Sequence, residues 1–281
     1  MICFIPRDIF IHLFESNSIT MPDVRFDLEH HVPPTERGFY CQDLSIRYPY
    51  KENFFKGVDM TVWIFILPVL LIWVCETALF QWNDPTKKKL KFFFLLYRQF
   101  IGLTFGHLIS VSITLFLMRT VGMLSPYFIE ICKPNVNCTQ PENKYKFIME
   151  YVCTRNDKEL LYGARSSFPS FGCLQAVRAA VQLILYIEAK ITFEYINLLK
   201  RLIQSFIFLL ANMLCAIIIR DNSSHWYDVL AGYILGILFG YFAAFYLMGW
   251  FDSEEKYSRS SDSLKSDLQI PSSTTVATKI D

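Results

Sequence analysis

Near its end the chain contains the stretch Arg220-Asp221-Asn222-Ser223-Ser224-His225-Trp226-Tyr227-Asp228-Val229-Leu230-Ala231-Gly232, in which a polar turn runs straight into an apolar helix. Small residues then recur at every fourth position, at Gly232, Gly236, Gly240 and Ala244. Small side chains at this spacing let a neighbouring helix approach closely inside a membrane. The stripe therefore predicts the bundle-facing side of a membrane helix, with Asp228 on the same stripe at its mouth. An acid in this place is either a functional-site residue or a helix cap that accepts hydrogen bonds from backbone N–H groups.

The composition is that of a membrane protein. Of the 281 residues, 53% are hydrophobic and 16% are aromatic, and the formal net charge is +1. Five stretches approach the roughly 20 apolar residues that a helix needs to cross a bilayer. They lie at about residues 60–80, 99–121, 169–187, 202–219 and 226–250. We therefore expect an all-α, multi-pass transmembrane helical bundle. No nucleic-acid partner, metal or cofactor is expected, because the charge is balanced and neither Cys-x-x-Cys pairs nor phosphate-binding glycine loops occur.

The segments between and beyond the spans give the predicted topology. The loop after the first span contains Lys87, Lys88, Lys89 and Lys91 and is therefore expected in the cytosol. Residues 32–250 would form the membrane domain. Residues 1–31 lack the pattern of a secretory signal and are expected to be interfacial or disordered. Residues 251–281 are Ser/Thr-rich and charged, which predicts a disordered cytosolic tail.

The longest loop, residues 122–168, follows the second span and is expected on the outer face. It contains Cys132, Cys138 and Cys153, and the sequon Asn137-Cys138-Thr139. Cysteines oxidise and sequons are glycosylated outside the cell. We expect a glycan on Asn137 and one disulfide within the loop, with Cys41 as a candidate partner for the third cysteine. The spacing leaves the connectivity open.

Several segments resemble the type 2 phosphatidic acid phosphatases, also called lipid phosphate phosphatases. The similar segments are residues 37–43, 45–51 and 225–232, and the similarity runs from about residue 33 to 250. The resemblance implies a bundle of six spans with both termini inside, of which the first span is missing here. It also implies a chemistry without a metal, in which a Lys and two Arg hold a lipid phosphate. A His oriented by an Asp attacks phosphorus, and a second His protonates the leaving oxygen.

The residues at the family's motif positions do not match that chemistry. The first motif is Lys, six residues, then Arg-Pro; the second is Pro-Ser-Gly-His; the third is Ser-Arg, five residues, His, three residues, Asp. The corresponding positions here are Met118 for the Lys, Ser125 for the first Arg, Pro126, Ser170, Gly172 for the acid His, Ile218 for the second Arg, Ser224 for the nucleophile, and Asp228. Ser170 and Asp228 are kept, whereas all three cations and both histidines are replaced.

Charged residues close to these positions are candidate replacements. Arg119 and His225 each follow a motif position by one residue, and Arg220 follows by two. One residue turns a helical side chain by about 100°, whereas catalytic geometry tolerates about half an ångström. We therefore interpret His225 as a mouth-lining residue. The candidate ligand-binding set is Arg119, Ser170, Arg178, Arg220, His225 and Asp228.

Two residues inside the spans also carry a prediction. Arg178, in the third span, either receives an acidic head group or is paired within the bundle, as lone intramembrane charges usually are. His107, in the second span, is interpreted as an interhelical hydrogen-bonding residue.

The segments 126–128, 132–135 and 164–170 are similar to the family's non-catalytic branch, the plasticity-related or phospholipid phosphatase-related proteins. This resemblance implies a plasma-membrane protein that acts through lipids or partners. The sequence therefore predicts a catalytically inactive relative that binds phospholipids such as lysophosphatidate or phosphatidate, or membrane-protein partners including a second copy of itself.

Two other classes of function remain as alternatives. The first is an active phosphatidate phosphatase with His225 as nucleophile and Arg119, Arg178 and Arg220 around the phosphate. The second is a transporter or lipid scramblase, motivated by Arg178 and His107 within the spans.

Overall fold

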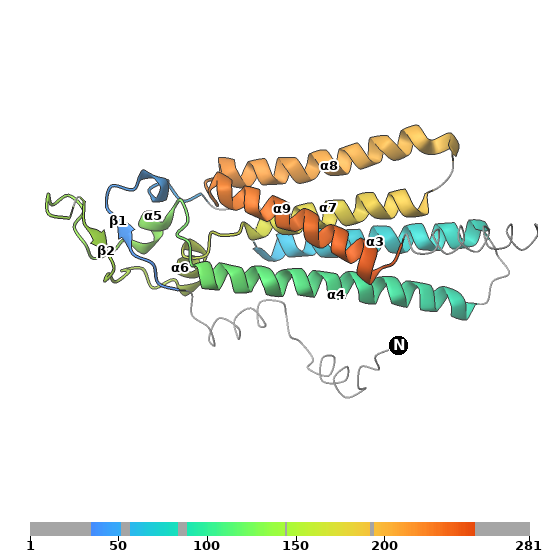
Figure 1. Ribbon diagram of the computed structural model, residues 1–281, viewed down its shortest axis with the longest axis horizontal. Helices are drawn as coiled ribbons and strands as arrows, with labels where there is room; N and C mark the ends of the chain where they lie inside the picture. The colour runs from blue at the N-terminus through green and yellow to red at the C-terminus, as the bar shows by residue number, and fades with distance from the viewer. Residues whose placement is uncertain (1–34, 52–56, 84–88, 144, 192–193, 251–281) are drawn as a thin grey trace, which may run out of the picture.

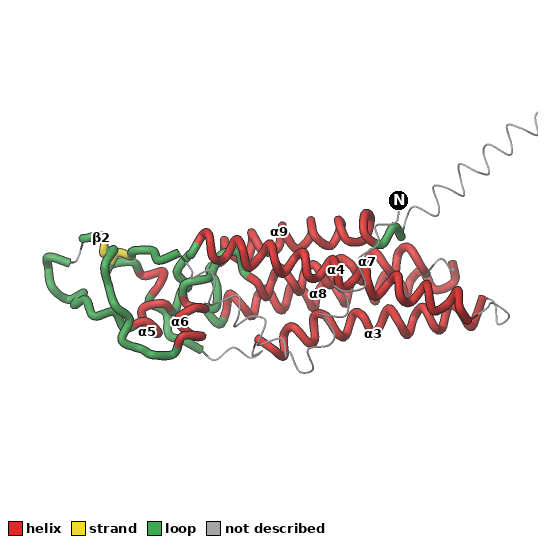
Figure 2. Tube along the Cα trace, turned by 90° about the horizontal axis from the view of Figure 1, so that it is seen from below, coloured by secondary structure: helices red, strands yellow, loops and turns green. Residues whose placement is uncertain are grey.

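The computed structural model describes residues 35–51, 57–83, 89–143, 145–191 and 194–250. The predicted N-terminal segment, residues 1–31, and the predicted tail, residues 251–281, lie outside the described residues. The described chain is an elongated bundle of long helices with a smaller irregular part at one end (Figure 1, Figure 2). The long helices are α3 (Gly57–Asn83), α4 (Lys89–Val121), α7 (Phe171–Lys190), α8 (Asn197–Arg220) and α9 (Trp226–Phe242), which continues into the π-helix η3 (Ala243–Leu247).

These helices confirm the predicted all-α, multi-pass class. Four of them are long and apolar enough to cross a bilayer: Phe92–Val121, Phe171–Lys190, Asn197–Arg220 and Trp226–Leu247. In α3 the described apolar part is Ile64–Ala78. The helical bounds differ from the predicted spans because helices continue into polar flanks, as at Asn197, where α8 begins before the predicted residue 202. The third span begins at Phe171 and not at residue 169, because Pro169 and the capping residue Ser170 precede the helix.

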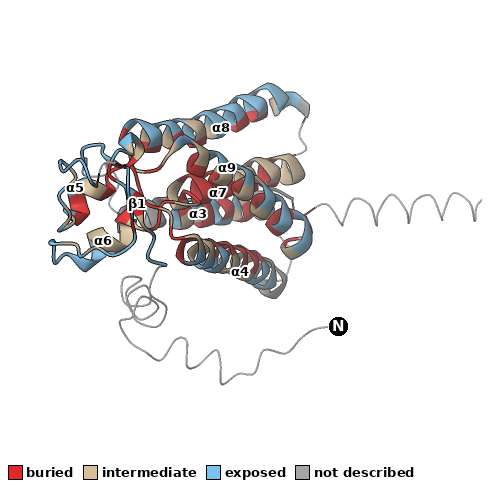
Figure 3. Cartoon of the chain, turned by 60° about the vertical axis from the view of Figure 1, so that its left-hand side comes forward, coloured by how far each residue is buried: buried red, intermediate tan, exposed pale blue. Residues whose placement is uncertain are grey.

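Helix α7 is the centre of the bundle and contacts α3, α4, α8 and α9 (Figure 3). Its contact with α9 is made by the small-residue stripe. A Cβ atom on Gly232 would lie 2.7 Å from the Ser170 carbonyl oxygen, and one on Gly236 would lie 2.7 Å from the Leu174 carbonyl oxygen. The backbones of the two helices therefore touch, which is the close approach that the stripe predicts.

The smaller part, which we call the cap, consists of residues 35–51 and 122–170. It contains η1 (Leu44–Ile46), α5 (Phe128–Cys132), α6 (Lys158–Ala164) and a strand pair in which β1 (Phe39–Tyr40) is antiparallel to β2 (Phe147–Ile148). Two disulfides close it, Cys41–Cys138 and Cys132–Cys153. Helices α4 and α8 end at the cap, and α3, α7 and α9 begin there (Figure 1).

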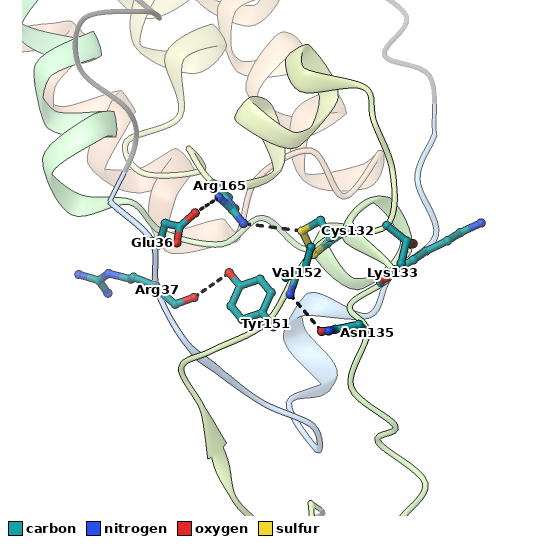
Figure 4. Close-up of a disulfide and its surroundings, with 10 residues drawn as sticks. Glu36, Arg37, Cys132, Lys133, Asn135, Tyr151, Val152 and Arg165 are labelled. Atoms are coloured by element: carbon teal, nitrogen blue, oxygen red, sulfur yellow. Dashed lines mark hydrogen bonds and ion pairs between the residues drawn. A yellow bond between two sulfur atoms is a disulfide. The ribbon is translucent and has the colours of Figure 1, made fainter.

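The start of the described chain is tied to the far side of the cap. Arg165 forms an ion pair of 2.8 Å with Glu36, and the Tyr151 hydroxyl donates to the Arg37 carbonyl oxygen at 2.9 Å (Figure 4). The Thr35 N–H donates to the Arg119 carbonyl oxygen at the end of α4. Residues 35–51 and the loop 122–168 thus form one unit at one end of the bundle.

A third disulfide, Cys173–Cys215, joins α7 to α8 inside the bundle. The sequence analysis did not foresee it, because each cysteine stands alone in an apolar stretch and periodicity does not say which helices face each other.

Candidate functional site

Three segments far apart in the sequence meet where the cap joins the bundle. The Ser125 N–H donates to the Ala164 carbonyl oxygen at 2.8 Å. The Ser167 N–H donates to the Met123 carbonyl oxygen at 2.9 Å, and the Ser170 N–H donates to the Asp228 carbonyl oxygen at 3.0 Å. These backbone bonds bring the three motif regions to one place, which we call the mouth.

Asp228 is the central side chain of the mouth and is fully buried. Its Oδ2 accepts hydrogen bonds from the Ser167 hydroxyl at 2.5 Å and from the His225 backbone N–H at 3.1 Å. The second bond is part of a capping box at the start of α9, so Asp228 acts as the helix cap that the sequence offered as one alternative. Its Oδ1 has no hydrogen-bond partner among the described residues. Ser167 was not identified from the sequence, since only Ser170 occupies a motif position.

His225 lies between Asp228 and the cap. Its Nδ1 is 3.1 Å from Asp228 Oδ2, and its Nε2 is 3.2 Å from the carbonyl oxygen of Ser45 in η1. The ring stacks on Tyr227 with centroids 4.9 Å apart, and the side chain is only 9% exposed. Both ring nitrogens are therefore engaged, and the imidazole has no nitrogen directed at open space in this arrangement.

The remaining motif positions form an uncharged wall. The side chains at the four substituted positions with a side chain are buried: Met118, Ser125, Ile218 and Ser224. The Ser125 hydroxyl donates to the Ala164 carbonyl oxygen at 3.1 Å. None of these residues, nor Gly172, brings a positive charge to the mouth.

The three candidate arginines have three different sets of partners. Arg119 is buried and its Nε donates to the Tyr162 hydroxyl at 3.1 Å. Arg220 forms an ion pair of 3.0 Å with Asp221, and its side chain is 67% exposed. Arg178 lies within the bundle on α7 and is fully buried.

The contacts of Arg178 match the alternative of pairing inside the bundle. Its Nε donates to Gln175 Oε1 at 2.9 Å, its Nη1 donates to Gln182 Oε1, and its Nη2 is 2.9 Å from His107 Nδ1 on α4. His107 therefore makes an interhelical hydrogen bond, as its interpretation from the sequence requires. Burying a cation among amides and an imidazole leaves its charge without a carboxylate among these contacts.

The site offers no evident metal centre. Among the residues that the structure describes, no group of three or more His, Cys, Asp or Glu side chains could hold a metal ion.

Comparison with known proteins gives a family match and several relatives. The model of the PAP2 superfamily matches residues 99–252. Similar proteins include "Putative phosphatidate phosphatase" of Drosophila melanogaster, 28% identical over 239 residues, which are 78% of this chain and 63% of that protein. Others are "Phospholipid phosphatase 2" of Rattus norvegicus, 29% identical over 80% of this chain and 81% of the relative, and "Phospholipid phosphatase 1" of Mus musculus, 25% identical over 80% and 79%.

The chain thus spans less than two thirds of the Drosophila relative and about four fifths of the two mammalian ones. No solved structure matches the chain. All three relatives are named as phosphatases, so the similarity to the non-catalytic branch stays a prediction.

Proposed function

This chain belongs to the PAP2 superfamily, and on that basis we propose that it is a phospholipid phosphatase-related membrane protein without hydrolase activity. It would bind phospholipids such as phosphatidate or lysophosphatidate, or a membrane-protein partner, at the cap end of the bundle. The observation that carries the proposal is the set of residues at the family's cation and histidine positions: Met118, Ser125, Gly172, Ile218 and Ser224. Phosphoryl transfer needs cations for the developing negative charge and a nucleophile aimed at phosphorus, and these side chains supply neither.

The surroundings of His225 support the same proposal. An imidazole that attacks phosphorus must present an unprotonated nitrogen to the substrate. Here Nδ1 faces Asp228 and Nε2 faces the Ser45 carbonyl oxygen. The candidate cations are also engaged elsewhere, Arg119 with Tyr162 and Arg220 with Asp221.

One observation favours the alternative, an active phosphatidate phosphatase. The 3.1 Å contact between Asp228 Oδ2 and His225 Nδ1 is the geometry with which a carboxylate orients a catalytic imidazole. This function would require the Ser45 carbonyl to move away from Nε2 and a set of cations to gather at the mouth.

Phosphate release from phosphatidate and lysophosphatidate by the purified full-length protein in detergent separates the two functions. The rat phospholipid phosphatase 2 serves as positive control, and His225→Ala as the matched variant. We expect no release above that of the protein-free blank. Release by the wild type that disappears in His225→Ala, together with a labelled phospho-histidine trapped at His225, would overturn the proposal in favour of the enzyme.

The proposal includes the orientation of the protein in the plasma membrane, with the cap outside the cell. The cap carries both Cys41–Cys138 and Cys132–Cys153. Asn137 is exposed in it, and its Oδ1 accepts hydrogen bonds from the Thr139 N–H at 3.0 Å and from the Thr139 hydroxyl at 2.6 Å. An endoglycosidase should lower the apparent mass of the surface-biotinylated protein and leave Asn137→Gln unchanged. An unglycosylated wild type would count against this orientation.

A further inference from the structure

A short segment of the cap, residues 41–50, lies across the mouth, and we call it the strap. One end is fixed by the Cys41–Cys138 disulfide. The other end is fixed by the Tyr48 N–H, which donates to the Pro126 carbonyl oxygen at 2.9 Å, and by the Tyr50 N–H, which donates to the Glu130 carboxylate. Between these anchors the strap forms the turn η1. Asp43 Oδ1 holds this turn by accepting from the Ser45 N–H at 2.9 Å.

The turn touches the bundle through a single backbone atom. The Ser45 carbonyl oxygen lies 3.2 Å from His225 Nε2, across 180 residues of sequence. Leu44, next to it, is 76% exposed, so the turn is not held there by apolar burial. Ile46 is buried, but in the core of the cap. The hydrogen bond to His225 is therefore the contact that closes the turn onto the mouth.

The protons around His225 can be counted from its partners. A carbonyl oxygen only accepts hydrogen bonds, so the Ser45 contact requires an N–H on Nε2. Asp228 Oδ2 already accepts from the Ser167 hydroxyl and the His225 backbone N–H, so it is a carboxylate oxygen and requires an N–H on Nδ1. A neutral imidazole has one N–H and makes one of these bonds. The ring that makes both is the imidazolium, with a proton on each nitrogen.

We propose that His225 is a proton-operated latch for the strap. The protonated ring holds Ser45 and closes the mouth. Loss of the proton leaves the remaining N–H on Nδ1, bonded to Asp228, and turns the Nε2 lone pair toward the Ser45 carbonyl oxygen. Two acceptors then face each other, the bond is lost and the strap releases the mouth. The latch closes at low pH and opens as the pH rises through the range in which histidines titrate, roughly pH 5–8.

The other charges around the ring favour its protonated form. On α9, Asp228 contacts the ring and Tyr227 stacks on it. The strap contributes Asp43, and the end of α8 contributes Arg220, which is neutralised by its ion pair with Asp221. The segment before α7 contributes the uncharged Ser167. The latch concerns access to the mouth and holds whether or not the protein hydrolyses lipids.

Hydrogen exchange of the full-length protein in phospholipid nanodiscs tests the latch. The readout is the protection factor of the Arg47 and Tyr48 amides at pH 5.5 and pH 8.5, corrected for intrinsic exchange. For the wild type we expect protection to fall roughly tenfold to a hundredfold at the higher pH, which corresponds to one charge-assisted hydrogen bond. The Leu174 amide in α7 should show unchanged protection and reports that the bundle stays folded.

Three variants separate the latch from other causes. His225→Gln keeps a side-chain N–H donor that does not titrate, so protection should be the same at both pH values. His225→Ala should leave the strap open at both. Tyr227→Phe removes the neighbouring phenol and should behave like the wild type. A wild type with constant protection, a His225→Gln that still responds to pH, or a Tyr227→Phe that loses the response would each overturn the proposal.

Discussion

The Ser167 hydroxyl donates a hydrogen bond of 2.5 Å to Asp228 Oδ2, joining the segment before α7 to the first turn of α9. Asp228 is fully buried and its other oxygen has no hydrogen-bond partner among the described residues. The acid therefore depends strongly on the few donors that it has, because an unsatisfied buried charged group is costly.

Replacing Ser167 by Ala should lower the free energy of unfolding by about 1–3 kcal/mol, the cost of leaving a buried acceptor without its donor. Thermal denaturation in detergent measures the change. Ser166→Ala is the matched control, because Ser166 is also buried but its hydroxyl has no hydrogen-bond partner in the described part of the chain. Equal losses for the two variants would show that the Ser167–Asp228 bond contributes nothing special.

Replacing Gly236 by Ala should destabilise the bundle by about 1–3 kcal/mol, as overpacking does. The new Cβ would lie 2.7 Å from the Leu174 carbonyl oxygen and 2.9 Å from Val177 Cβ, so α9 would have to move away from α7. The control is Gly163→Ala in α6, where the nearest atom would be the Tyr127 hydroxyl at 3.5 Å. This control should be neutral or stabilising by up to about 1 kcal/mol. A Gly236→Ala protein with an unchanged melting temperature would contradict the backbone contact.

Replacing Gln182 tests whether the Arg178 charge lacks a counterion. Gln182→Leu removes an acceptor from a buried cation and should cost about 1.5–3 kcal/mol. Gln182→Glu places a carboxylate in the same position and should keep or raise the melting temperature, because a paired buried charge is less costly than an unpaired one. A Gln182→Glu variant that is less stable than Gln182→Leu would indicate that the Arg178 charge is already compensated.

The cap should lose stability at alkaline pH through Tyr127. Burial raises the pKa of the Tyr127 phenol, a hydrogen bond with Ser125 opposes this in part, and the nearby Tyr50 raises the pKa further. Below its ordinary pKa of about 10 the phenol is neutral in both the folded and the unfolded chain. Above that value the unfolded chain ionises first, so stability falls as the pH rises toward the folded pKa. Melting temperatures between pH 8 and pH 11 should fall less steeply for Tyr127→Phe than for the wild type; equal slopes would exclude this residue as the cause.

The cysteines make a covalent prediction. Peptide mapping of the unreduced protein should recover the pairs Cys41–Cys138, Cys132–Cys153 and Cys173–Cys215. Among the described cysteines, Cys75 alone is free and should react with a maleimide once the protein is denatured. A linked peptide that pairs Cys41 with Cys132 or Cys153 would show a different closure of the cap.

The bundle was largely predictable because a bilayer requires long apolar runs, and such runs are visible in one chain without its partners. The α7–α9 contact was predictable for a related reason, since Gly232, Gly236 and Gly240 mark the close face directly. The contacts of the mouth were not. Ser45 meets His225 through a backbone carbonyl, which every residue has, so no side-chain pattern marks it. Ser167 serves Asp228 from outside any motif position, and the partners of Arg178 depend on which face of α7 turns toward α4.

The glycine stripe also restricts how this molecule can move. With Gly236 against the Leu174 carbonyl and Gly240 against Val181, α7 and α9 are meshed backbone to backbone and can neither slide nor roll without collision. The floor of the mouth therefore behaves as a single rigid beam, and the freedom to admit a visitor resides in the short arc of chain above it.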